Sequence, residues 1–173
     1  RRRQRQMCIR DSVSTEYWLP IELAKVWEFY SSIENLARVT HPSLKVDVVS
    51  RDELTKGAEF HLQWSLAHLP MKVDWHGEYV EVDQGRDRCV MVDVLRRGYL
   101  FSYWKHKHVF EAAQFPNRSN ESGQSGGTWV RDEVKFKMPV LSAPIFRSAE
   151  FARKQIVKIL NYRKKKIMEI LVS

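Results

Sequence analysis

Between Leu44 and Met138 the sequence alternates between apolar and polar residues, and this period of two constrains the fold more than any other feature. Side chains of a β-strand point alternately to opposite faces, so the alternation predicts a sheet with one apolar face. Turn signals rich in Gly and Pro interrupt the pattern at short intervals, which indicates an antiparallel meander. The strands predicted here are Leu44–Arg51, Ala58–Ala67, Met71–Val82, Arg88–Leu95, Leu100–Ala112 and Thr128–Met138.

One further strand and three helices flank this meander. Val13–Leu19 alternates loosely and predicts a first strand. Ile21–Tyr30 follows a proline and repeats apolar residues every three or four positions, as a helix packed on one side does. Ile33–Thr40 predicts a second short helix. Ile145–Val172 predicts one long helix with an apolar face and a basic face.

This order of elements implies a cavity. Seven antiparallel strands twist and curl, and their apolar concave face must be covered. A single helix, about 10–12 Å in diameter, is too narrow to fill that trough, so inward side chains or a ligand must occupy the rest. We therefore expect residues 13–173 to form a single α+β domain in which a curved seven-stranded sheet and two short helices surround one long C-terminal helix.

The first twelve residues are set apart from this domain. Residues 1–11 hold five arginines and one acid, which is +4 of the formal net charge of +8. Residues 7–12 resemble a translated sequencing adaptor, so we expect residues 1–12 to be a disordered or artefactual leader. The body of the chain is then only mildly basic, which argues against a nucleic-acid partner.

Neither a signal peptide nor a membrane-spanning helix is expected, because no apolar run is long enough. The expected location is the cytoplasm. The basic face of the last helix is a candidate for peripheral membrane contact. The oligomeric state, fusion to another domain and the identity of a ligand do not follow from the sequence.

Several segments resemble one family. Pro20–Tyr30 and Gly57–Phe60 resemble the first helix and the glycine-led third strand of the START-like or SRPBCC superfamily, which includes polyketide cyclases and coenzyme Q-binding-like proteins. Gly98–Phe110, with its Trp-x-His-x-His-x-Phe pattern, resembles a strand of a bacterial ligand-binding branch, and Thr128–Pro139 and Leu160–Arg163 resemble its last strand and final helix. The resemblance implies the helix-grip fold of START domains and birch-pollen allergens, with a hydrophobic pocket between the sheet and the last helix.

His106 and His108 are the candidates for chemistry. They share one strand face with two aromatic residues, which makes that face the concave one. Asp132 falls on the inward phase of the next strand. If Phe110 faces Thr128 across the hairpin, Asp132 faces His106, and we predict a hydrogen bond or ion pair between them.

Three interpretations of this histidine pair remain open: a structural pair, polar contacts for a ligand head group, and acid–base or metal chemistry. Two histidines supply too few ligands for zinc, so no metal site is expected unless Asp132 or another strand contributes. No cofactor is expected.

The leading hypothesis is binding or carriage of a hydrophobic small molecule such as a lipid, a quinone or a polyketide, which requires no catalysis. The alternative is a cyclase or dehydratase in which His106 and Asp132 act as acid and base. A third hypothesis, an RNA-binding or ribosome-associated module, rests on the basic helix and the basic tail. The predicted ligand-binding residues lie on inward strand positions or on the apolar face of the last helix: Trp64, Trp75, Tyr79, Trp104, His106, His108, Phe110, Asp132, Val134, Phe136, Ile156 and Leu160.

Overall fold

The computed structural model describes residues 11–66, 71–113, 126–139 and 148–172. Seven antiparallel strands form one sheet in the order β1-β7-β6-β5-β4-β3-β2. The α+β helix-grip class predicted from the sequence is confirmed. The elements are β1 Asp11–Leu19, α1 Leu23–Ser31, α2 Asn35–Arg38, β2 Leu44–Arg51, β3 Glu59–Leu66, β4 Lys72–Gln84, β5 Arg88–Gly98, β6 Tyr103–Ala113, β7 Gly127–Lys137 and α3 Ala149–Val172.

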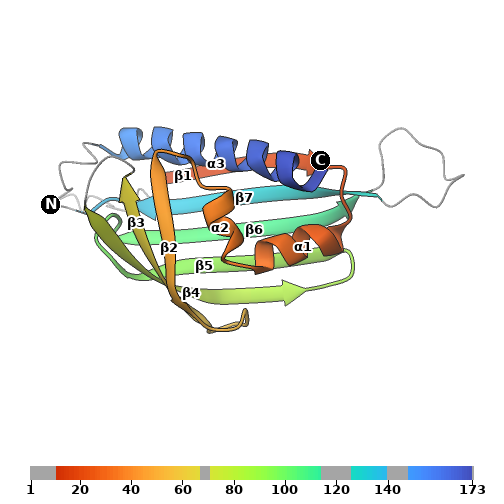
Figure 1. Cartoon of the computed structure of the whole chain (residues 1–173), viewed down its shortest axis with the longest axis horizontal. Helices are drawn as coiled ribbons and strands as arrows, with labels where there is room; N and C mark the ends of the chain where they lie inside the picture. Colours follow the sequence, from red (N-terminus) through yellow and green to blue (C-terminus); the bar gives the residue numbers. More distant parts are fainter. Residues whose placement is uncertain (1–10, 67–70, 114–125, 140–147, 173) are drawn as a thin grey trace, which may run out of the picture.

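The sheet is strongly curved. Figure 1 shows β2 and β3 running steeply across the direction of β5, β6 and β7. Pairing is irregular after Val48 in β2 and after His76 and Tyr79 in β4, and such bulges bend a strand and increase its twist. Gly77 faces Phe60 across β3 and β4, and the ring lies where a Cβ of residue 77 would stand. The missing side chain thus lets the ring pack onto the bend.

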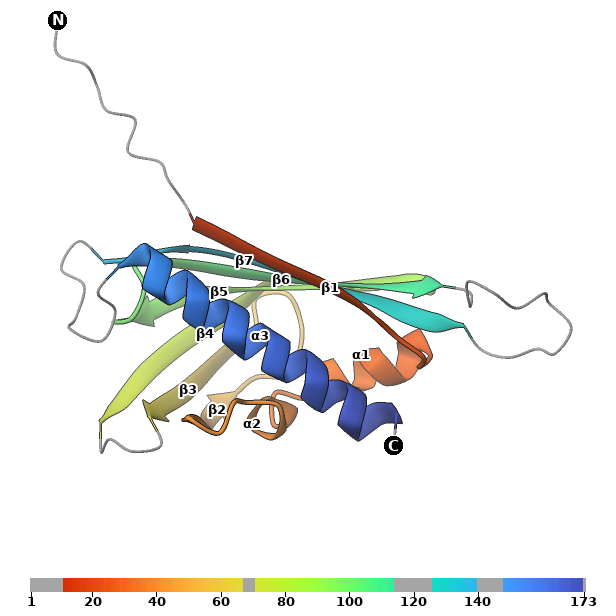
Figure 2. The same cartoon turned by 90° about the horizontal axis from the view of Figure 1, so that it is seen from above.

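Helix α3 runs obliquely along the concave side of the sheet, with α1 and α2 on the same side (Figure 2). Its buried residues recur at spacings of four and seven, so that one face of the helix is turned to the sheet. No helix in the described ranges is long and apolar enough to span a membrane. These buried residues are Ala152, Ile156, Leu160 and Ile167.

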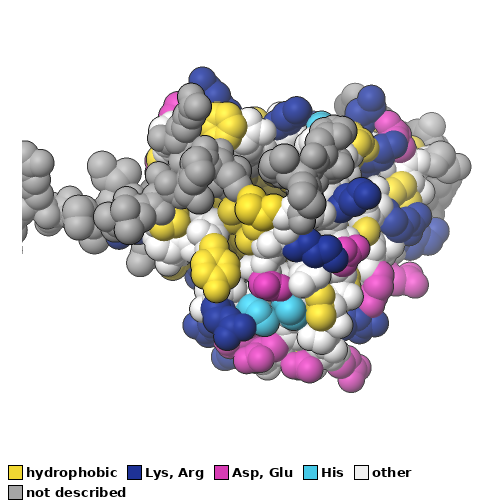
Figure 3. All heavy atoms as spheres, turned by 60° about the vertical axis from the view of Figure 1, so that its left-hand side comes forward, with side chains coloured by type: hydrophobic (Ala, Val, Ile, Leu, Met, Phe, Trp, Pro, Cys, Tyr) yellow, Lys and Arg dark blue, Asp and Glu magenta, His cyan; other side chains and the backbone are white. Residues whose placement is uncertain are grey.

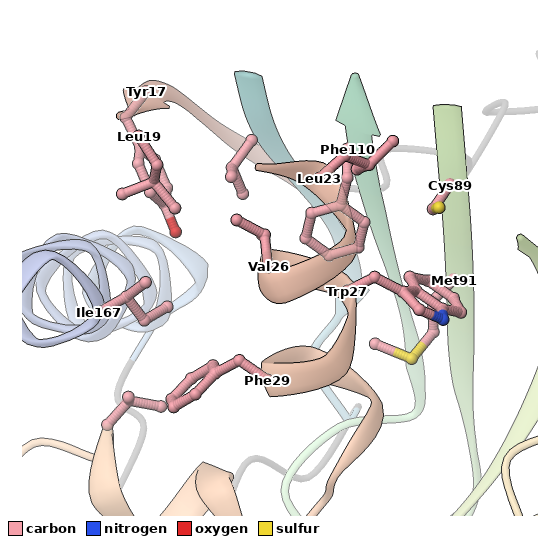
Figure 4. Close-up of a cluster of buried hydrophobic side chains, with 12 residues drawn as sticks. Tyr17, Leu19, Leu23, Val26, Trp27, Phe29, Cys89, Met91, Phe110 and Ile167 are labelled. Atoms are coloured by element: carbon pink, nitrogen blue, oxygen red, sulfur yellow. The ribbon is translucent and has the colours of Figure 1, made fainter. Parts of the chain in front are cut away.

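The first half of the core lies around α1 (Figure 4). Val26 and Phe29 point toward the part of α3 that carries Ile167, and Trp27 points toward the sheet. The rings of Trp27 and Phe110 meet edge to face with centroids 5.9 Å apart. Helix α1 therefore fills one end of the trough between sheet and α3. A second apolar cluster, which includes Val134, Phe136 and Phe101, lies under the other half of α3.

The structure corrects several predicted boundaries. β1 begins at Asp11, so Asp11 and Ser12, which we assigned to the leader, are strand residues paired with β7. They extend the strand because β7 continues far enough to offer them backbone partners. Residues 1–10 lie outside the described part. Helix α2 has four residues rather than eight, β5 continues beyond Leu95 to Gly98, and α3 is described only from Ala149, so its predicted start at Ile145 lies outside the described residues.

Replacing Phe136 by Ala is expected to lower the free energy of unfolding by about 3–5 kcal/mol, because the change leaves a void in the core. The Phe136 side chain is fully buried, and its ring packs edge to face on Phe101 at 5.7 Å. Denaturant unfolding measures the loss. Tyr99→Ala is the matched control: Tyr99 is 78% exposed, so its removal is expected to change stability by no more than about 0.5 kcal/mol. Equal losses in the two variants would contradict the core position of Phe136.

Candidate functional site

A cavity of about 240 Å³ lies between α3 and the concave face of the sheet. Helices α1 and α2 close one side of it, through residues that the sequence analysis did not single out, such as Phe29, Tyr30 and Leu36. Most of its wall is apolar or aromatic. Of the predicted ligand-binding residues, these line the cavity: Trp64, Trp75, Tyr79, Trp104, His106, His108, Val134, Ile156 and Leu160.

Three predicted residues do not line the cavity. Phe110 and Phe136 are fully buried in the two apolar clusters, where neighbouring rings cover them. Asp132 is 2% exposed and lies behind the histidines. All three occupy inward strand positions, as predicted, but neighbouring side chains cover an inward residue that lies next to α1 or α3. Alternation along a strand does not distinguish an inward residue that lines the cavity from one that is covered in this way.

The predicted register between β6 and β7 is wrong by two residues. Phe110 pairs with Val130, not with Thr128, so Asp132 faces His108 and not His106. The reason is that the two strands stay paired up to Ala113 and Gly127. A shift of two keeps every side chain on its face, and Asp132 therefore remains on the inward side.

Asp132 contacts both histidines. Its Oδ1 accepts a hydrogen bond of 2.5 Å from Nδ1 of His108. Nε2 of His106 lies 3.3 Å from the same oxygen, at an angle that does not make a hydrogen bond. The predicted approach of His106 to Asp132 is thus present as a close contact, whereas the direct hydrogen bond belongs to His108.

A fourth polar residue, Asp93, completes this cluster from the other side. It lies on β5 directly opposite His106, and its side chain is 14% exposed. Its Oδ2 is 3.9 Å from Nδ1 of His106 and 3.9 Å from Nε2 of His108. The sequence analysis missed this residue, although Cys89, Met91 and Asp93 alternate in phase and place an acid on the inward face.

Burial dominates the electrostatics of the cluster. It lowers the pKa of His106 to about 3, helped by neighbouring His108, so His106 is neutral at physiological pH. Burial also raises the pKa of Asp93 to about 6, against the opposing effect of His108 and Arg163. For Asp132 burial alone would raise the pKa, but the contacts with the two histidines outweigh it and hold the pKa well below its usual range.

Arg163 and a tyrosine pair lie near the same polar end. Arg163 projects from α3 into the cavity wall, although its position in a run of basic residues suggested a surface patch. Tyr17 and Tyr30 share a hydrogen bond of 2.7 Å between their hydroxyl groups, and Tyr30 also packs edge to face on His108. The cavity wall is therefore mostly apolar, with a polar end at which Asp93, the two histidines, Tyr30 and Arg163 lie together.

A second histidine cluster lies outside the cavity, on β3 and β4. His61 and His76 stack with ring centroids 4.0 Å apart, and Nε2 of His61 lies 2.8 Å from Oδ1 of Asp74. Asp74 is about half exposed. Figure 3 shows histidine side chains at the surface beside acidic and basic ones. This outer cluster is solvated and faces away from α3.

Solved structures with a similar architecture include members of several related groups of proteins. A START superfamily protein from Mycobacterium smegmatis is 10% identical over 92% of this chain and 96% of its own, with a TM-score of 0.62. Norcoclaurine synthase from Thalictrum flavum, solved with dopamine and hydroxybenzaldehyde, is 10% identical over 95% of this chain and 87% of its own, with a TM-score of 0.58. Major latex-like protein 151 from Panax ginseng is 8% identical over 95% and 99%, also with a TM-score of 0.58.

The chain has the START-like fold. At these identities the likeness is one of fold, and the START-like fold is generally one that binds ligands. No family model and no curated protein matches the sequence. The residues within the START-like cavity must therefore be interpreted from their own chemistry.

Replacing Asp132 by Ala is expected to lower the free energy of unfolding by about 1–3 kcal/mol, because the buried Nδ1–H of His108 loses its acceptor. Asp132→Asn should lose less, since the amide oxygen can still accept this hydrogen bond. Denaturant unfolding of both variants compares them. Glu133→Ala is the control: this partly exposed neighbour pairs with Lys135, and its loss should change stability by about 0–1 kcal/mol. If the Ala and Asn variants are equally stable, the hydrogen bond does not stabilise the fold.

Proposed function

We propose that this protein binds or carries a hydrophobic or amphipathic small molecule in the cavity between α3 and the sheet. The observation that carries the proposal is a cavity whose wall is mostly apolar and aromatic, with charged and hydroxyl groups gathered at one end. Ligand sites in proteins have this composition, because the apolar wall supplies affinity and a few polar groups set orientation. Catalysis is not needed for this function.

The cavity favours a compact ligand. Its volume of about 240 Å³ is below the range of about 300–1,000 Å³ that is usual for small-molecule sites, so a ring system or a short chain fits better than a whole phospholipid. Trp64, Trp75, Tyr79 and Trp104 present aromatic surfaces to the ligand. A quinone ring, an aromatic polyketide or a short lipid matches this shape, with its polar group toward His106 and Arg163.

The cavity can be blocked from the helix side without disturbing the sheet. Ile159 lines the cavity from α3 and is partly exposed. The larger side chain of a Trp at this position can therefore fill the cavity without disrupting the packed core. We expect Ile159→Trp to weaken binding of the fluorescent amphiphile 8-anilinonaphthalene-1-sulfonate at least tenfold, which is about 1.4 kcal/mol. A fluorescence titration measures the affinity, and competition with a quinone, a fatty acid or a polyketide then identifies the ligand class.

Lys158→Trp is the matched control for this experiment. Lys158 is the preceding residue on α3 and is exposed, so the same substitution adds an aromatic ring outside the cavity. Its dye affinity should equal that of the unmodified protein. Equal affinities in all three proteins would place the dye elsewhere and remove the main support for a ligand in this cavity.

The alternative function, acid–base catalysis of cyclisation or dehydration by His106 and Asp132, has weaker support. His106 lines the cavity and contacts Asp132, which is the arrangement that such a mechanism needs. However, a pKa of about 3 makes His106 a poor base near neutral pH. Asp132 is shielded from the cavity by the histidines. Binding is therefore the function that this geometry supports best.

Binding of RNA also has weaker support. Several basic residues of α3 are paired with acids of the same helix, and these pairs reduce the net charge that the helix presents to a phosphate backbone. Arg163, from the most basic run, lines the cavity instead. The pairs are Lys154 with Glu150, and Lys165 and Lys166 with Glu169.

A further inference from the structure

We propose that Asp93, His106 and His108 form a binding site for a divalent transition-metal ion at the polar end of the cavity. The three residues come from the adjacent strands β5 and β6, and their ligand atoms lie within 4.8 Å of one another. The proposal revises the expectation from sequence. Two histidines alone supplied too few ligands, and the third ligand comes from β5.

The separations are close to those around one ion. Bonds from zinc to nitrogen or oxygen are about 2.0–2.2 Å long, so two ligands of one tetrahedral ion lie about 3.3–3.6 Å apart. Oδ2 of Asp93 is 3.9 Å from Nδ1 of His106 and 3.9 Å from Nε2 of His108. These distances are too long for hydrogen bonds and need only a small side-chain rotation to fit an ion.

Asp132 orients the imidazole ring of His108 for this role. It accepts the hydrogen bond from Nδ1 of His108, so Nε2 of that ring, with its lone pair, faces Asp93. Nε2 of His106 lies beside the same oxygen of Asp132, and Nδ1 of His106 faces Asp93. A metal-binding histidine commonly has its other nitrogen held by a carboxylate in this way. Asp132 is therefore a positioning residue behind the site.

A cation also suits the charge of this cluster. Nδ1 of His106, Nε2 of His108 and Oδ2 of Asp93 converge, and a positive charge at their centre stabilises the Asp93 carboxylate. Among the described residues, no ion pair within 4.0 Å joins Asp93 to a lysine or arginine. Arg163 supplies one positive charge near the buried carboxylate of Asp93, and Asp132 adds a second buried carboxylate beside the histidines, so a divalent ion is compatible with the local charge.

The chemistry of the ligands selects the class of ion. Two imidazoles and one carboxylate suit zinc or ferrous iron, whereas calcium and magnesium prefer oxygen ligands. Three protein ligands leave at least one coordination position free. All three residues line the cavity, so that position faces the space in which a small molecule would lie. Metal binding itself does not depend on such a ligand.

Zinc binding to the whole chain tests the proposal without any organic ligand. Protein freed of metal with a chelator and titrated with zinc sulfate should bind one zinc ion per chain at this site, as measured by calorimetry and elemental analysis. Removal of a residue that only positions a metal ligand typically costs about 10–100-fold in metal affinity, and Asp132→Asn should weaken zinc binding within that range. Asp93→Asn removes a ligand itself and should weaken zinc binding by more than that. Circular dichroism checks that both variants are folded.

The outer histidine cluster provides the control, because it is an alternative zinc site on the same chain. His61→Ala removes a histidine that contacts Asp74 and stacks on His76, and it should leave the affinity of the inner site unchanged. Anomalous diffraction from crystals of the unmodified protein, soaked in zinc, locates the ion independently of any variant. It should lie about 2.0–2.2 Å from the three ligand atoms.

Two results would overturn the proposal. One is the absence of an anomalous zinc signal beside Asp93 in the zinc-soaked crystals, whether the position is empty or holds a water molecule. The other is zinc affinity lost in His61→Ala but retained in Asp93→Asn. Neither result bears on the dye titration of the Ile159 variant, so failure of the metal site and failure of the proposed ligand binding are distinguishable.

Discussion

The structure depends on the difference in width between a curved sheet and the long helix that covers it. Helix α3 buries one row of residues against the concave face, and α1 fills one end of the trough, but a cavity remains between them. Burial of apolar surface stabilises this arrangement even though the interior is not completely filled. A fold that keeps such a space must have enough core elsewhere, and here the two apolar clusters at either end of α3 provide it.

The polar end of the cavity is the second feature of consequence. Two carboxylates and two histidines lie on three neighbouring strands, in a region where desolvation opposes every charge. The hydrogen bond between His108 and Asp132 satisfies part of this group, while Oδ2 of Asp93 lies 3.9 Å from each of the two histidines, beyond hydrogen-bond distance. The arrangement fits a site that is completed by something bound in the cavity, whether a ligand's polar group or a metal ion.

The residues of this site differ in how well the sequence predicted them. His106 and His108 were found because they alternate with aromatic residues, and their inward direction follows from the period of a strand. The predicted pairing with Asp132 on β7 was wrong by two residues, because register depends on where the two strands stop pairing, and a shift of two leaves the alternation unchanged. Asp93 and Arg163 were missed because an acid among valines and an arginine among lysines look like surface residues until the neighbouring elements are placed.

The sequence by itself determined the order of strands and helices, the face to which each strand side chain points, and the presence of a trough too wide for one helix. These properties follow from local periodicity, which each segment carries on its own. Only the tertiary structure decided which inward residues line the cavity, which are covered by packing, and which carboxylate meets which histidine. Those outcomes depend on strand register, on bulges and on the position of α3, all of which are set by contacts between segments far apart in the chain.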